Sequence, residues 1–166
     1  MVARQSRPVH LCGLSLGGIV TARLPARSPS RVASLIPAGT PVRPARDFST
    51  ALRGYQLLPG SVLRAFSDIA NRREWLRMIS ELSATDLRPD LPHITAPATV
   101  VCGSLDRRAL PAARELAVAI PGARLWVAPF QRHSWPMTSP RLFGRVVAGF
   151  ARGSGAGPAA ASVTPV

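Results

Sequence analysis

Three side chains in this sequence have the types and the surroundings that nucleophilic catalysis requires. Ser15 lies at the centre of Gly13-Leu14-Ser15-Leu16-Gly17, between two apolar runs. Asp106 follows another apolar run by three residues, and His133 follows a further one by five. A serine hydroxyl becomes a nucleophile when a histidine removes its proton and a carboxylate orients and stabilises the imidazole. We therefore predict Ser15 as the nucleophile, His133 as the base and Asp106 as the acid.

The segment around Ser15 predicts a strand, a sharp turn and a helix. Residues 8–13 form an apolar run typical of a strand, and residues 16–27 fit a helix that Pro25 should kink or end early. A turn this tight leaves no space for side chains beside the serine, so glycine is needed two residues to either side. Free N–H groups at the start of the helix, with its positive dipole end, can stabilise a developing oxyanion.

Further short apolar runs, bounded by proline and glycine, predict the rest of a parallel sheet. The predicted strands are 32–36, 98–103 and 123–128, and the predicted helices are 111–120 and 140–151. A strand, a helix and a strand in close succession form a βαβ unit, whose strands are parallel. In an open parallel sheet, reactive groups gather beyond the carboxyl ends of the strands. We therefore expect Ser15, Asp106 and His133 to meet at one edge of the sheet.

Two regions do not follow this rhythm. Residues 40–90 are punctuated by proline, and their apolar residues recur at steps of three and four, which predicts amphipathic helices at about 46–57, 61–70 and 72–84. This region is too long for an ordinary connection and is interpreted as a helical insertion. Residues 152–166 are mostly small, without a core pattern, and we expect this tail to be disordered.

Each candidate residue also has an alternative role. Asp106, considered alone, fits a loop carboxylate that pairs with one of the two arginines following it, and His133 alone fits a surface histidine. His10 lies within the first strand and His93 precedes the third, so neither follows a strand end. No other choice of residues places a serine, a carboxylate and a histidine at the same edge.

Composition limits the classes of function. The 166 residues carry a formal net charge of +13, and all 21 basic residues are arginines spread along the chain. No basic tail, set of stacking aromatic residues or zinc-ligand spacing accompanies this charge, so we expect neither nucleic-acid binding nor a metal site. The apolar content predicts one globular domain over residues 1–151.

The cysteines and the apolar runs indicate a compartment. Cys12 and Cys102 both fall in strands predicted to be buried, and two thiols without a disulfide framework favour a reduced compartment. The sequence contains no run of about 18 uncharged apolar residues, the length needed to cross a membrane as a helix. Its first residues lack the apolar core of a signal peptide. We therefore expect a cytoplasmic protein with no membrane partner.

In combination, four segments resemble the C-terminal part of an α/β-hydrolase superfamily member and cover most of residues 8–151. They are His10-Leu-Cys-Gly-Leu-Ser-Leu-Gly-Gly18 with Ser28-Pro-Ser-Arg-Val32, Asp86-Leu-Arg-Pro-Asp-Leu-Pro-His-Ile-Thr-Ala-Pro97, Thr99-Val-Val-Cys-Gly-Ser-Leu-Asp106, and His133-Ser-Trp-Pro with Ser139-Pro-Arg-Leu-Phe143.

The resemblance implies an α/β fold of about four parallel strands flanked by helices, with the insertion at about 40–90 as a cap over a substrate pocket. It implies the triad Ser15, Asp106 and His133, with the N–H of Leu16 as one oxyanion donor. The implied activity is hydrolysis of a small ester, thioester or lactone through an acyl-enzyme, with a small-molecule substrate and no cofactor.

The sequence also departs from the family's pattern. Gln131 and Arg132 precede His133, where family members usually carry a glycine, and only fourteen residues precede Ser15. The family's first four strands and the loop that supplies a second oxyanion donor should lie before the nucleophile. We therefore expect a partial fold whose first strand is an exposed edge open to self-association. Two functions follow: a serine hydrolase, truncated or mis-started, or a catalytically silent hydrolase-like fragment with a binding or scaffold role.

Overall fold

A computed structural model describes residues 7–43, 57, 72–152 and 163–164. The chain divides into two compact units. The larger unit holds the sheet and contains the chain up to Val42 and from Leu87 onward, whereas the smaller unit is Arg43–Asp86.

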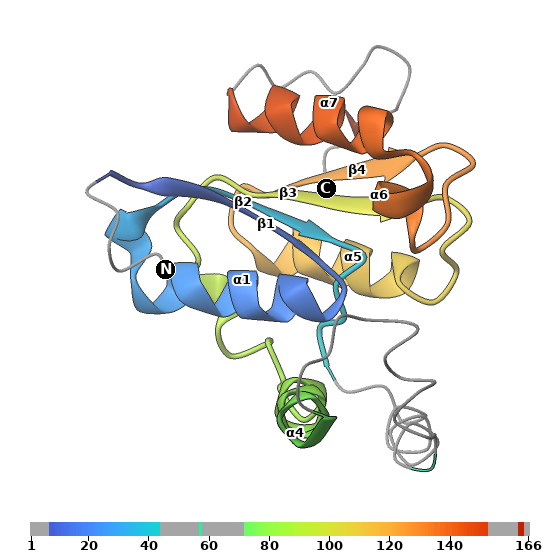
Figure 1. Ribbon diagram of the computed structural model, residues 1–166. Coiled ribbons are helices and arrows are strands. Elements are labelled where there is room, and N and C mark those ends of the chain that lie inside the picture. Colours follow the sequence, from blue (N-terminus) through green and yellow to red (C-terminus); the bar gives the residue numbers. More distant parts are fainter. Residues whose placement is uncertain (1–6, 44–56, 58–71, 153–162, 165–166) are drawn as a thin grey trace. The chain divides into compact units, whose positions relative to one another are not determined.

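A parallel sheet forms the centre of the larger unit (Figure 1). Its strands are β1 (Val9–Leu14), β2 (Val32–Ala38), β3 (Thr99–Gly103) and β4 (Arg124–Ala128), which lie side by side in chain order. All three neighbouring pairs are parallel. The predicted four-stranded parallel sheet is therefore confirmed, with each strand within two residues of its expected bounds.

A short fifth strand, β5 (Val163–Thr164), runs antiparallel to β4. Val163 pairs with Trp126, and Thr164 pairs with Leu125. The prediction of a tail without regular structure over 152–166 is wrong at these two residues, because backbone pairing along a free strand edge requires no core pattern in the sequence. Residues 153–162 lie outside the described part of the chain.

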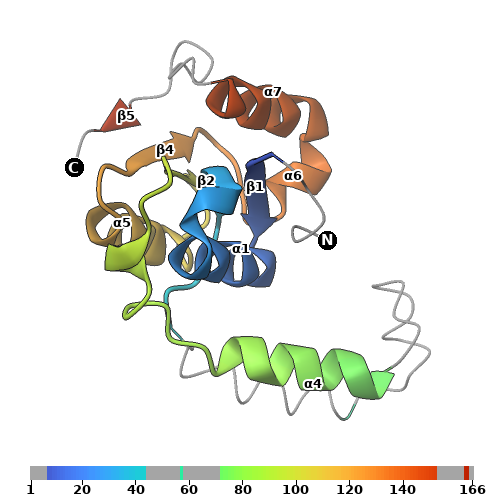
Figure 2. The ribbon, with the colours of Figure 1, turned by 90° about the vertical axis from the view of Figure 1, so that its left-hand side faces the viewer.

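Helices cover both faces of the sheet (Figures 1 and 2). On one face, α1 (Leu16–Arg27) packs against β1 and β2, and α5 (Leu110–Ala119) packs against β3 and β4. On the other face lies α7 (Pro140–Ala151), preceded by the single turn α6 (Trp135–Thr138). Two short 3₁₀ segments, Pro29–Arg31 and Leu91–His93, lead into β2 and precede β3.

The core on the α7 side is rich in aromatic residues. Trp126 of β4 and Trp135 of α6 are each 1% exposed, with ring centres 5.9 Å apart. Phe143 of α7 meets the Trp135 ring edge to face at 4.9 Å. This packing fixes the segment that directly follows His133 against the sheet.

Helix α1 has the predicted bounds and does not end early at Pro25, one of the two effects expected of this proline. A kink at Pro25 stays a prediction. The helix runs on to Arg27, and the N–H of Ser28 donates to the carbonyl of Leu24 at 2.8 Å. Pro25 lies in the last turn and is buried. Since a proline there removes one hydrogen bond close to the helix end, burial of its ring offsets much of the cost.

A second proline explains a gap in the ladder between β2 and β3. On the side of β2 that faces β3, the N–H of Leu35 donates to the carbonyl of Pro97 at 2.9 Å, and the N–H of Gly39 donates to the carbonyl of Val101 at 2.8 Å. Pro37 lies between them in β2 and has no N–H to donate. The backbone pairing of β2 with β3 is accordingly limited to Ala38 with Val101 and to an isolated bridge between Leu35 and Ala98.

Within the described residues, β1 pairs with β2 only and forms one edge of the sheet. His10 and Cys12, which lie on the same face of β1, are exposed, although the sequence predicted Cys12 to be buried. The reason is alternation: Gly13 faces α1, so Cys12 faces the opposite side, where an edge strand is poorly covered. Self-association through this edge stays a prediction.

The smaller unit contains α4 (Arg72–Ser83), close to the predicted helix 72–84. Arg77 and Glu81 form an exposed ion pair of 2.9 Å along it. The helices predicted at 46–57 and 61–70 fall on residues outside the described part, apart from Leu57. The role of this unit as a cap stays a prediction. Among the described helices, none combines the length and apolar character that crossing a membrane requires.

Candidate active site

Ser15 occupies the sharp turn between β1 and α1 in a strained conformation. Its φ is 53° and its ψ is −119°, an arrangement that non-glycine residues rarely adopt. The N–H of Ser15 donates to the carbonyl of Ala38 at 2.8 Å, and its carbonyl accepts from the N–H of Gly18 at 2.9 Å. These two hydrogen bonds hold the turn, which places Ser15 directly after the carboxyl end of β1.

The glycines of this turn have different roles. A Cβ on Gly13 would lie 2.5 Å from the carbonyl carbon of Gly17 and 2.7 Å from the nitrogen of Gly18, so the strand and the helix meet only because Gly13 lacks a side chain. Gly18 makes room in the same way for Thr40. At Gly17, in contrast, no described atom lies within 4 Å of a Cβ. Outside its own helix and chain neighbours, the described residues therefore leave room for a side chain at Gly17, and the structure shows a need for glycine only on the Gly13 side.

Asp106 follows β3 and is buried, with 7% of its surface exposed. Its backbone N–H donates to the carbonyl of Gly103 at 3.1 Å, and its carbonyl accepts from Leu110 at 3.0 Å. One carboxylate oxygen, Oδ1, accepts a hydrogen bond of 3.2 Å from the N–H of Ala109. The carboxylate is thus held against the start of α5, where free N–H groups favour negative charge.

The second carboxylate oxygen meets His133. The distance from His133 Nδ1 to Asp106 Oδ2 is 2.6 Å. Because an ionised carboxylate can only accept, this contact places a proton on Nδ1 and leaves Nε2 as the free acceptor. Asp106 therefore holds the imidazole in the tautomer that a general base needs, instead of pairing with either of the two arginines after it.

Gly39 lies next to two of the candidate residues, Ser15 and His133. It directly follows β2, has φ of 52°, and its missing Cβ would lie 3.2 Å from both Nδ1 and Cε1 of His133. The N–H of Ser15 donates to the carbonyl of the preceding residue, Ala38, so both Ser15 and the imidazole lie next to this strand end. Among the described contacts, no hydrogen bond joins Ser15 to His133.

The start of α1 supplies the first predicted oxyanion donor. Leu16 is the first residue of α1, so its N–H has no carbonyl partner four residues earlier in the helix. This N–H adjoins the Ser15 hydroxyl along the chain, at the positive end of the helix dipole. The arrangement can stabilise negative charge on an oxygen that Ser15 attacks.

Sequence reasoning did not find three residues of this site. Gly39 borders the imidazole, Thr40 fills the space above Gly18, and Ser104 accepts a hydrogen bond from the loop that carries His133. Gly39 follows an apolar run, and this position could have signalled a strand end. The roles of Thr40 and Ser104 depend on contacts between distant segments, which the local sequence does not reveal.

Burial affects a neighbouring thiol. Cys102, in β3, is fully buried, and this burial together with the negative charge of Asp106 raises the pKa of its thiol to about 12. Cys102 is therefore neutral near pH 7 and does not act as a nucleophile. Trp135, which follows His133 by two residues, lies in the core.

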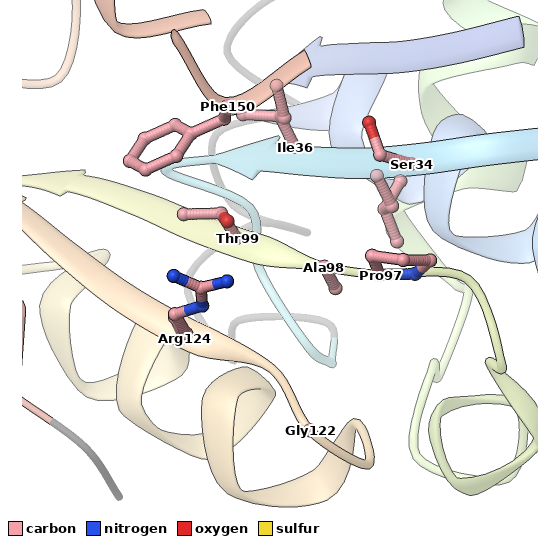
Figure 3. A pocket seen from close by; sticks show the side chains of 9 residues that line it. Ser34, Ile36, Pro97, Ala98, Thr99, Gly122, Arg124 and Phe150 are labelled. Atoms are coloured by element: carbon pink, nitrogen blue, oxygen red, sulfur yellow. The ribbon is translucent and has the colours of Figure 1, made fainter. Parts of the chain in front are cut away.

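A shallow pocket lies elsewhere, around the first residues of β3 and β4 (Figure 3). Its lining includes Ser34, Thr99, Arg124 and Phe150. Thr99 and Arg124 are at the amino ends of their strands, whereas Ser15, Asp106 and His133 follow carboxyl ends. The pocket is therefore not part of the candidate site. The described residues include no cluster of His, Cys, Asp or Glu side chains that could hold a metal ion.

Comparison with protein families identifies one family, and comparison with solved structures finds proteins of similar fold. The model described as alpha/beta hydrolase family matches residues 1–146. The enol-lactonase from Burkholderia xenovorans LB400 is 25% identical with a TM-score of 0.67, covering 88% of this chain and 66% of the lactonase. A hydrolase from Pseudomonas aeruginosa PA01 is 24% identical with a TM-score of 0.67, covering 93% of this chain and 67% of that one.

An esterase from Exiguobacterium antarcticum is also similar, at 21% identity and a TM-score of 0.66, with coverage of 87% of this chain and 66% of the esterase. The chain thus spans slightly less than two thirds of the lactonase and of the esterase. No protein of curated function matches the sequence significantly.

Proposed function

The chain belongs to the alpha/beta hydrolase family, and we propose that within it the protein is a serine hydrolase that cleaves a small ester, thioester or lactone. The observation that carries the proposal is the 2.6 Å contact of His133 Nδ1 with Asp106 Oδ2 beside the strained turn at Ser15. An imidazole that a carboxylate orients, with its Nε2 available to a serine hydroxyl, is what acyl transfer to serine requires.

In the first half of the reaction, His133 Nε2 takes the proton of Ser15 Oγ as this oxygen forms a bond to the substrate's carbonyl carbon. The carbonyl oxygen becomes negatively charged and is stabilised by the N–H of Leu16. When the bond to the leaving oxygen or sulfur breaks, the His133 cation gives its proton to the leaving group. In a lactone the leaving oxygen stays attached to the acyl group as a hydroxyl.

In the second half, water attacks the acyl-enzyme and loses a proton to His133. The bond from the acyl carbon to Ser15 Oγ breaks, the serine oxygen regains a proton from His133, and a carboxylic acid leaves. Asp106 stabilises the imidazolium in both halves without itself taking the proton. The enzyme returns to its starting state, and one water is consumed for each ester bond.

Support for ester or lactone chemistry comes from solved structures that are similar to this chain. One similar protein is an enol-lactonase and another is an esterase. A cap formed by the segment at about 40–90 would shield the acyl-enzyme and select the acyl group. The cap role, the second oxyanion donor and the full activity belong to the proposal, together with a location in the cytoplasm.

The test is hydrolysis of short p-nitrophenyl esters and of a small enol-lactone by wild-type protein and by two variants. Ser15→Ala should lose at least about 10³-fold in kcat, since removal of the nucleophile disables the whole triad. The matched control is Ser30→Ala, an exposed serine in the turn before β2, which should keep wild-type rates. Equal rates for wild type and Ser15→Ala would contradict the proposal and favour a silent fragment with a binding or scaffold role.

A further inference from the structure

Two loops carry the acid and the base, and they are tied to each other beyond the ends of their strands. The β3 loop, residues 103–106, bears Asp106, and the β4 loop, residues 129–133, bears His133. Ser104 N–H donates to the carbonyl of Ala128 at 2.8 Å, and Leu105 N–H donates to the carbonyl of Gln131 at 2.9 Å. The Asp106–His133 contact therefore depends on how these loops are held together.

The β4 loop contains a strained residue. Phe130 has φ of 57°, which a non-glycine residue adopts only when its surroundings require it. Its side chain is 84% exposed, so packing does not hold it there. Its N–H instead donates to Ser104 Oγ at 2.8 Å. The Ser104 hydroxyl thus holds the left-handed turn three residues before His133, together with a longer hydrogen bond of 3.4 Å from the N–H of Gln131 to the carbonyl of Ala128.

Other contacts hold the rest of the β4 loop. Gln131 Oε1 accepts a hydrogen bond of 3.2 Å from Ser139 Oγ, at the start of α7. A Cβ on Gly103 would lie 2.7 Å from the carbonyl carbon of Gln131, so the loops approach closely only because Gly103 lacks a side chain. Gln131 lies in the segment where the sequence departs from the family's usual glycine, and its side chain helps to hold the β4 loop through the hydrogen bond with Ser139.

We propose that Ser104 is a positioning residue, which holds the β4 loop in the left-handed turn at Phe130 and thereby keeps His133 on Asp106. Ser104 acts through the backbone of Phe130, and no described contact joins its side chain to Asp106 or His133. The consequence for turnover rests on the proposed serine hydrolase function, whereas the consequence for the Asp106–His133 contact does not.

The first test compares Ser104→Ala with the conservative Ser104→Thr, which retains a hydroxyl. Ser104→Ala should lower kcat by about 10- to 100-fold with KM within about twofold of wild type, because small misplacement of a catalytic group slows the chemical step. Ser104→Thr should recover most of this loss. Ser30→Ala is again the remote control.

A second readout does not require activity. The proton between His133 Nδ1 and Asp106 Oδ2 gives a far-downfield proton NMR signal in wild-type protein, which Asp106→Asn assigns by abolishing it. Ser104→Ala should broaden or shift this signal, and Ser104→Thr should restore it. If wild type shows the signal but no turnover, the hydrolase proposal fails while the positioning role is still tested.

A third variant separates positioning from general loss of structure. Glycine adopts positive φ without strain, so adding Phe130→Gly to Ser104→Ala should restore kcat and the NMR signal toward those of Phe130→Gly alone. A double variant that stays as impaired as Ser104→Ala would overturn the proposal. So would a Ser104→Ala protein with wild-type kcat and an unchanged signal.

Discussion

At the scale of single residues, Ser15 combines local strain with few constraints on its side chain. A non-glycine residue with φ of 53° costs on the order of 1–3 kcal/mol, which the hydrogen bonds to Ala38 and Gly18 must offset. Among the described residues, no hydrogen bond engages the Ser15 hydroxyl, so the turn is held by its backbone contacts alone.

The close approach at Gly13 gives a prediction with a matched control. Gly13→Ala should lower the free energy of unfolding by about 1–3 kcal/mol, since the new methyl group would overlap the backbone of Gly17 and Gly18. Gly17→Ala should leave stability unchanged or raise it by about 0.5–1 kcal/mol, because the described surroundings of Gly17 are open and alanine favours helix. Urea unfolding of the two variants and wild type measures both values. Equal losses of unfolding free energy in the two variants would contradict the assignment of the close contact to Gly13.

At the scale of elements, the sequence predicted the strands and helices of the larger unit well. Apolar runs such as 98–103, bounded by glycine and proline, correspond to buried central strands. Two outcomes depend on tertiary context. Pro25 is buried in the last turn of α1 and does not end the helix early, and Cys12 lies on an exposed face of an edge strand instead of being buried.

The site was predicted to a similar extent. Asp106 and His133 were expected at one sheet edge and are in contact, since parallel strands bring their carboxyl ends together. The residues that align them, Ser104 and Gly39, were not predicted. Their contacts join segments that are 26 and 94 residues apart, for Ser104 with Phe130 and Gly39 with His133. No local pattern encodes such pairs.

At the scale of the whole molecule, Cys102 links stability to pH. Its thiol pKa rises from 9.0 to about 12 on folding, so between these values the folded state binds more protons than the unfolded state. Its contribution is therefore complete below pH 9.0 and is lost as the pH rises toward 12, at up to about 1.4 kcal/mol per pH unit.

Unfolding free energies between pH 8 and pH 11 test this dependence. Cys102→Ala should show a shallower loss of stability with rising pH than wild type does. Val101→Ala, a buried change in the same strand without a titratable group, should lower stability while keeping the wild-type slope. Parallel curves for wild type and Cys102→Ala would contradict the assigned role of the thiol.

The proposed catalytic triad is also a property of the whole chain, because Ser15, Asp106 and His133 come from three separate parts of it. A fluorophosphonate forms a bond from phosphorus to an activated serine oxygen with loss of fluoride, and it reports the nucleophile without knowledge of the substrate.

The most direct measurement is tandem mass spectrometry of folded protein after reaction with a fluorophosphonate. One adduct is expected, on Ser15, with about 10⁴-fold slower labelling in Asp106→Asn, since this change favours the wrong tautomer of His133. An adduct on another residue, or folded protein that does not react, would contradict this expectation.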